Sequence, residues 1–250
     1  MTIINHSISS AIGFAFVLCL FFITLFPTNV YAVVIDDHGD KFNISISSID
    51  APFAIVTAQI NVENGKLATG SGGSYDWKRG WADFISEVTA KTLTGDTLNV
   101  SEQGEGFESY WLITNNGEEV SDLIQLNYKV DLSYTRKEWD FGNEQAGRIY
   151  KEGLYSVTKP FFMSTDNEKG AEVSFDLPTS WSIAAPWWEL GDGRYLTEDF
   201  DTLQSNAFTV GHFESESTSL NGFDVEIILI GKLINIALLI TIYQWRRNKC

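Results

Sequence analysis

The stretch from Leu123 to Tyr134 constrains the fold of this chain more than any other feature of the sequence. Apolar residues recur there at every second position, and Gln, Asn, Lys, Asp and Ser stand between them. Because successive side chains of a strand point to opposite faces, the pattern predicts a strand with one buried and one wet face, typical of an antiparallel sheet. The residues predicted to face the core are Ile124, Leu126, Tyr128, Val130, Leu132 and Tyr134.

Shorter runs of the same kind surround this stretch and are separated by turn signals such as Asn64-Gly65 and Asn115-Asn116-Gly117. No helical periodicity is sustained before residue 233, although short helical turns are predicted at 153–156 and at 197–203, the latter capped by Thr197. We therefore predict a mainly β domain, an antiparallel β-sandwich, over residues 33–226. The further predicted strands are 41–46, 53–62, 84–89, 110–114 and 172–177.

Residues Met1 to Ala32 are predicted to be a secretory signal. An uncharged apolar run, Ala11 to Phe26, is followed by Pro27 and by the small-x-small pattern Val30-Tyr31-Ala32, where cleavage is expected. The alternative is an uncleaved anchor helix, since the run approaches the length that spans a bilayer. Either interpretation exports the following domain, to a periplasmic or extracellular face.

The apolar tail, residues 227–250, permits two interpretations. The first is a transmembrane helix from Ile227 to Trp245 with a basic end, Arg246, Arg247 and Lys249, that stays cytoplasmic and tethers the domain. The second makes 223–230 the last strand of the sandwich. We favour the membrane helix, because the run is apolar on all sides rather than striped.

Composition and missing motifs exclude several functions. The formal net charge of −16 leaves no basic patch for nucleic acid. The sequence holds no His-Glu-x-x-His, no Gly-x-Ser-x-Gly and no Cys/His cluster with metal spacing. The acidic segments Asp36–Asp40 and Asp192–Asp201 are interpreted as structural loops rather than calcium sites. We expect no catalytic residues, no metal and no cofactor, and hence a chain that is not itself an enzyme.

The aromatic residues carry the strongest remaining signal. Trp181, Trp187 and Trp188 fall within one short segment that begins at Leu177. Exposed tryptophans could form a platform for a sugar or a peptide, but the favoured interpretation is packing in the core or against another domain, because tryptophan is highly buried on average.

The same segment resembles the M61 peptidases, the glycyl aminopeptidase group. Its Leu-Pro-x-x-Trp pattern starts at Leu177, and a second matching block runs from Phe200-Asp201 through Leu203 and Ser205 to Val210-Gly211-His212-Phe213. Gly73-Ser74-Tyr75 resembles a further loop of that family, and the whole resemblance covers residues 40–230.

The resemblance implies a scaffold domain that has no catalytic residues of its own. Members of the family are zinc aminopeptidases with an N-terminal β-sandwich and a thermolysin-like catalytic domain, and only the sandwich is matched. No position here corresponds to the zinc ligands. The implied partners are an M61-type catalytic domain or an extracytoplasmic peptide, with the tail in the membrane. The candidate binding or interdomain surface comprises Trp181, Trp187, Trp188 and Tyr75.

Three functions therefore stay open. The preferred one is a non-catalytic, extracytoplasmic scaffold or binding module, tethered to a membrane. The second is a truncated fragment of a secreted zinc aminopeptidase whose catalytic domain is missing. The third is a carbohydrate- or peptide-binding module that uses Trp187 and Trp188.

Overall fold

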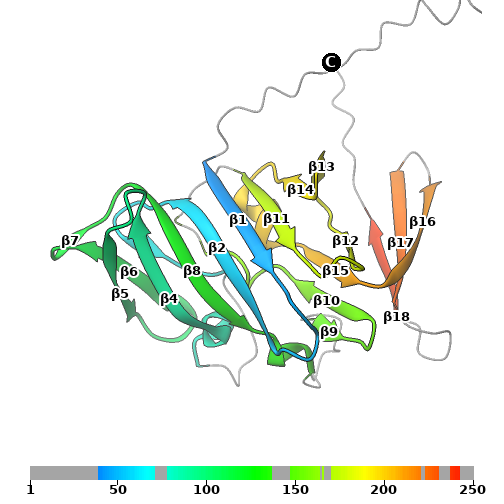
Figure 1. Cartoon of the computed structure of the whole chain (residues 1–250), viewed down its shortest axis with the longest axis horizontal. Coiled ribbons are helices and arrows are strands. Elements are labelled where there is room, and N and C mark those ends of the chain that lie inside the picture. The colour runs from blue at the N-terminus through cyan, green and yellow to red at the C-terminus, as the bar shows by residue number, and fades with distance from the viewer. Residues whose placement is uncertain are drawn as a thin grey trace, which may run out of the picture. The chain divides into compact units, whose positions relative to one another are not determined.

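The computed structural model describes residues 39–70, 78–136, 147–163, 165, 170–220, 223–230 and 237–242. The chain divides into two compact units, 1–36 and 37–250, and the first lies wholly outside the described residues. The signal helix predicted for Met1 to Ala32 therefore stays a prediction. Among the described residues of the second unit, strands dominate and form three sheets, which confirms the mainly β fold class (Figure 1).

The largest sheet has eleven strands, in the order β13-β14-β11-β1-β2-β8-β4-β5-β6-β3, with β7 paired to β6 (Figure 1). Its pairs are antiparallel except for β1 and β11, which run parallel with Asp40 opposite Ala171. The prediction of a purely antiparallel sheet is wrong at that pair. The strands are β1 Asp40–Ser45, β2 Phe53–Asn61, β3 Lys66–Leu67, β4 Ile85–Thr92, β5 Thr97–Gln103, β6 Tyr110–Asn115, β7 Glu118–Glu119, β8 Leu123–Asp131, β11 Ala171–Asp176, β13 Trp188–Gly191 and β14 Arg194–Leu196.

The alternating stretch from Leu123 forms β8 as far as Asp131, and its apolar face is buried as predicted. The strand ends at Asp131, whose carboxylate accepts a hydrogen bond of 2.8 Å from the backbone N–H of Ser133. A 3-10 helix, η3 (Leu132–Arg136), follows. Leu132 and Tyr134 are still buried, although they belong to η3 rather than to the strand.

A four-stranded sheet, in the order β12-β15-β10-β9, shares one hydrophobic core with the large sheet. Phe175 of β11 packs edge-on against Phe208 of β15, with ring centroids 5.2 Å apart. The Tyr134 hydroxyl donates to Ser156 Oγ of β10 at 2.6 Å, since the Ser156 hydroxyl itself donates to a carbonyl. This arrangement is sandwich-like. The strands are β9 Gly147–Ile149, β10 Gly153–Val157, β12 Ser182–Ala184 and β15 Ala207–Gly211.

Three residues of the connection between β10 and β11 belong to the core. Phe161, Phe162 and Met163 are fully buried, and the Tyr128 hydroxyl donates to the Phe161 carbonyl at 2.5 Å. The Phe162 ring meets Phe42 edge-on at 4.9 Å. The carbonyls of Phe161 and Phe162 both accept side-chain hydrogen bonds, so Phe161, Phe162 and Met163 act as part of the core rather than as a surface loop.

Two predicted helical turns have different outcomes. Residues 153–156 belong to strand β10, so the helical turn predicted there is wrong. Residues Phe200–Gln204 form the short helix α2, but Thr197 is not its cap. The Asp199 carboxylate caps it by accepting from the Thr202 N–H at 2.6 Å, while Thr197 is buried and accepts from the Ala171 N–H. The remaining 3-10 turns are η1 Gly80–Phe84 and η2 Gly106–Glu108.

The predicted transmembrane helix is not found. A three-stranded antiparallel sheet, β16-β17-β18, occupies this part of the chain (orange to red in Figure 1). Within the described ranges, no helix has the length and apolar character needed to cross a membrane. The physical reason is the abundance of β-branched residues, which favour strands. The strands are β16 Phe213–Leu220, β17 Phe223–Ile230 and β18 Ala237–Ile242.

Candidate functional site

The predicted tryptophan surface is divided by the structure. Trp187 is buried, with 5% of its surface exposed, whereas its neighbour Trp188 is 48% exposed at the start of edge strand β13. Trp181 is half-buried and packs against the core. Tyr75 lies outside the described residues. The structure therefore presents Trp188 to solvent and assigns Trp187 to the interior.

Trp187 lies at the centre of an aromatic cluster that we call the Trp187 cluster, formed with Phe162, Phe175 and Tyr195. The Trp187 ring stacks on Phe175 at 6.4 Å and meets Phe162 and Tyr195 edge-on at 5.8 and 6.4 Å. Its indole Nε1 is buried and has no hydrogen-bond partner among the described residues. The cluster joins the connection at Phe162 to strands β11 and β14, so its geometry is that of core packing.

Burial of tyrosine hydroxyls predicts that the fold weakens at alkaline pH. Burial raises the pKa of Tyr195 to about 12, with Glu189 and Glu226 adding repulsion, and burial also raises the pKa values of Tyr128 and Tyr134. The unfolded hydroxyl ionises near its ordinary pKa of about 10. The contribution of these buried hydroxyls to the free energy of unfolding is therefore fully present below about pH 10. It decreases as the pH rises towards 12.

Thermal melting from about pH 8 to pH 12 measures this effect, with tyrosinate absorbance as a second reading. Tyr195→Phe removes one of the groups, so it is expected to lose less stability than wild type across the same pH range. A melting temperature that stays constant through pH 11 in wild type would contradict the prediction.

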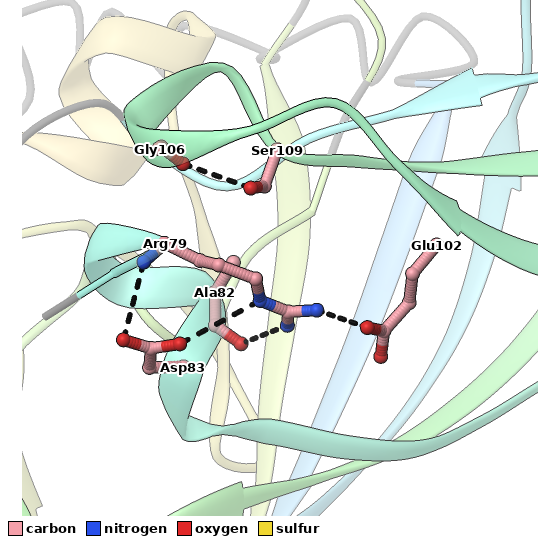
Figure 2. A network of polar contacts seen from close by, with 6 residues as sticks. All are labelled: Arg79, Ala82, Asp83, Glu102, Gly106 and Ser109. Atoms are coloured by element: carbon pink, nitrogen blue, oxygen red, sulfur yellow. Dashed lines mark hydrogen bonds and ion pairs between the residues drawn. The ribbon is translucent and has the colours of Figure 1, made fainter.

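A second cluster, the Arg79 network, was not predicted from the sequence (Figure 2). The Arg79 guanidinium donates to the Ala82 carbonyl at 2.7 Å and forms ion pairs with Asp83 and Glu102. It also lies 5.6 Å above the Trp111 ring. The spacing of Arg79 and Asp83 by four residues was a detectable signal, but nothing in the sequence pointed to Glu102. The network holds η1 against β5 and β6.

Arg79→Ala is expected to destabilise the fold by about 1–2 kcal/mol, because the planar guanidinium makes several contacts at once. Arg194→Ala is the matched control, since Arg194 makes one ion pair of 3.5 Å to Glu172 and is half exposed. Its cost is expected to be below about 0.5 kcal/mol. Urea unfolding of both variants measures the difference, and equal costs would contradict it.

The two acidic segments discussed above contribute residues to a strand and to a turn. The carboxylate of Asp40 is buried and accepts from the Asn61 N–H at 2.8 Å, and Asp192 lies in the β13–β14 turn with a φ of +55°. Asp36 and Asp37 lie outside the described residues. Across the described part of the chain, no group of three or more His, Cys, Asp and Glu side chains could hold a metal ion.

No protein-family model and no curated protein matches the sequence. Among solved structures, the chain is similar to an aminopeptidase N family protein from Idiomarina loihiensis, with a TM-score of 0.59 and 15% identity. That alignment covers 77% of this chain and 32% of the other, so this chain spans about a third of the length of its relative. The likeness is one of fold.

Two further likenesses are weaker. The M1 zinc metallopeptidase from Deinococcus radiodurans has a TM-score of 0.43 and 12% identity, over 75% of this chain and 45% of its own. Leukotriene A4 hydrolase from Saccharomyces cerevisiae has a TM-score of 0.42 and 15% identity, over 71% of this chain and 29% of its own. The fold thus resembles the N-terminal domain of zinc aminopeptidases. The predicted resemblance to a peptidase N-terminal domain is supported at that level, but the relatives are named as aminopeptidase N family and M1 proteins rather than as M61 peptidases.

Proposed function

We propose that this chain is the N-terminal β domain of a zinc aminopeptidase whose zinc-binding part lies outside these 250 residues. The observation that carries the proposal is the likeness to the Idiomarina loihiensis protein over 77% of this chain but 32% of that one. The sequence resemblance, drawn from the segment around Trp181 and from the block ending at Phe213, indicated the same class of domain. We assign it to the M1 type rather than to M61, since the structural relatives are of that type.

Under this proposal, the domain itself catalyses no reaction. No His-Glu-x-x-His is present, so the zinc ligands and the general base must come from the missing part. The domain supplies a rigid sandwich against which a catalytic domain packs and which helps to shape the substrate cleft. This is the fragment hypothesis of the sequence analysis, and the structural likeness favours it over a stand-alone module.

The DNA that follows the codon for Cys250 tests the proposal. We expect a reading frame, in any phase, that encodes a His-Glu-x-x-His motif. Absence of such a frame would leave the stand-alone scaffold as the better explanation.

Enzyme assays give an independent test. The purified chain with added zinc is expected to release no aminocoumarin from aminoacyl-coumarin substrates, whereas co-expression with the downstream polypeptide is expected to yield turnover. Hydrolysis by the purified chain alone, abolished by a zinc chelator, would show that the chain carries its own active site.

We also propose export, on the basis of the uncharged run before Ala32. Expression in a bacterial host is expected to yield a periplasmic protein whose sequence starts at Val33. A chain that keeps Met1 and resists carbonate extraction from membranes would support the anchor helix instead. A cytoplasmic chain that keeps Met1 would refute both.

A further inference from the structure

The described part of the chain contains two Asn-Gly pairs, Asn64-Gly65 and Asn116-Gly117, and each forms a two-residue turn. All four residues have a positive φ, as tight turns of this kind require. A third pair, 221–222, lies outside the described residues. Each described turn joins two antiparallel partners, which are Glu63 with Lys66 and Asn115 with Glu118. The two turns therefore match in sequence and in backbone conformation.

An Asn-Gly pair reacts spontaneously where the glycine nitrogen can reach the asparagine side chain. The nitrogen attacks the side-chain carbonyl carbon, Cγ, and a five-membered succinimide forms. The C–N bond of the side-chain amide breaks, and its nitrogen leaves as ammonia with the proton of the glycine N–H. Water then opens the ring at one of its two carbonyls, which gives aspartate or isoaspartate. The attack requires the peptide unit between the two residues to rotate, so a hydrogen bond at the glycine N–H opposes it.

The peptide unit between Asn116 and Gly117 is free to rotate. Both residues are exposed, and neither the Gly117 N–H nor the Asn116 carbonyl forms a hydrogen bond with another residue that the structure describes. A Cβ built at Gly117 would meet nothing within 4 Å, so the space around the turn is open as well. Glycine adopts φ values of either sign, so its N–H can turn towards the Asn116 side chain.

The peptide unit between Asn64 and Gly65 is held in place. Gly65 is buried, its N–H donates to the Val120 carbonyl at 2.8 Å, and its carbonyl accepts from the Ile113 N–H at 2.7 Å. The Asn64 N–H donates to Ser121 Oγ at 3.0 Å. A Cβ built at Gly65 would lie 2.5 Å from the Ile113 carbonyl oxygen, which shows how closely the backbones approach. Rotation here has to break hydrogen bonds that the other turn does not have.

We propose that Asn116 is a modification site of this protein, where deamidation through a succinimide produces aspartate and isoaspartate, while Asn64 is protected. Two backbone hydrogen bonds of ordinary net strength correspond to about a tenfold difference in rate or more. The product adds a carboxylate beside exposed Glu118 and Glu119, and isoaspartate also lengthens the backbone of the β6–β7 turn by one methylene. The inference is independent of the proposed function, since the reaction needs only water.

Peptide mapping by mass spectrometry, applied to the full chain during storage in mildly alkaline buffer, tests the proposal. In the folded chain we expect Asn116 to deamidate at least about tenfold faster than Asn64, with aspartate and isoaspartate both among the products. In guanidinium chloride, which removes the turns, the two rates are expected to agree within about twofold, because glycine follows both asparagines. Equal rates in the folded chain, or the same tenfold difference in denaturant, would overturn the inference.

Gly117→Ala tests whether the backbone nitrogen at position 117 is the attacking atom. The added Cβ restricts the backbone and hinders the approach to Asn116 Cγ, so deamidation at Asn116 is expected to slow by about tenfold while Asn64 keeps its rate. Thermal melting checks that the variant stays folded, which the open space around position 117 makes the expected result. An unchanged rate at Asn116, or aspartate without isoaspartate, would indicate direct hydrolysis by water and contradict the inference.

Discussion

Trp187→Ala is expected to destabilise the fold by about 3–5 kcal/mol, the usual cost of removing a large buried ring. The Trp187 ring contacts Phe162, Phe175 and Tyr195 at once, so the cavity opens where the connection meets two strands of the large sheet. For a domain of this size the loss lowers the melting temperature by about 10 °C or more. Thermal unfolding followed by circular dichroism measures it.

Trp188→Ala is the matched control. It removes the same kind of side chain from the next position, but that side chain is half exposed on an edge strand. We expect a cost within about 1 kcal/mol. If the two variants lost equal stability, the assignment of Trp187 to the core would be wrong. If Trp187→Ala folded normally and lost binding to a sugar or peptide, the platform hypothesis would regain support.

Gly211→Ala is expected to cost about 3–5 kcal/mol, through backbone strain and overpacking together. Gly211 has a φ of +131°, and a Cβ placed there would lie 2.4 Å from the Glu152 carbonyl oxygen and 2.4 Å from the Cα of Gly153. Gly153 is its cross-strand partner in β10, so neither backbone can move away without breaking the pair. Urea unfolding of the purified variant measures the loss.

Gly117→Ala separates the two contributions. Gly117 also has a positive φ, +90°, but nothing lies within 4 Å of a Cβ built there. Alanine at this position has the strained backbone without the clash. We therefore expect the free energy of unfolding to fall by about 1 kcal/mol. A Gly211→Ala protein as stable as the Gly117→Ala protein would show that strands β10 and β15 are not as closely apposed as the structure places them.

Period-two patterns predicted strands of the large sheet because one face of those strands is buried and the other is more exposed. β8 and β2 alternate between buried and more exposed residues, and the contrast is written directly in the sequence. The turns at Asn64-Gly65 and Asn116-Gly117 were predictable for a similar reason, since all four residues have positive φ. The parallel pairing of β1 with β11 had no local signal, because pairing partners distant in sequence leave no trace in periodicity.

The tail shows the limit of reasoning from hydropathy. An apolar run without stripes fits a membrane helix, but it also fits strands buried on both faces. The β-branched residues Ile227, Ile228 and Ile230, which lie within the predicted helix, were the signal for strands. The prediction gave more weight to apolar character on all sides than to side-chain shape.

The candidate site was only partly predictable. The segment of Trp181, Trp187 and Trp188 was singled out from the sequence, but a sequence does not reveal which of two adjacent tryptophans points inward. The Arg79 network depends on Glu102, which reaches Arg79 only because β5 passes beside η1. Such a contact is created by the tertiary fold and has no sequence pattern.

The parallel pair β1–β11 joins two strands that lie far apart in the sequence. Asn43 of β1 donates to Ser174 of β11 at 3.0 Å across a separation of 131 residues. Contacts this distant in sequence slow folding, because a long loop must close before the pair is formed. As the chain is synthesised, β1 waits without that neighbour until β11 has emerged. A nascent chain stalled before residue 171 is therefore expected to be more sensitive to protease than the full-length chain.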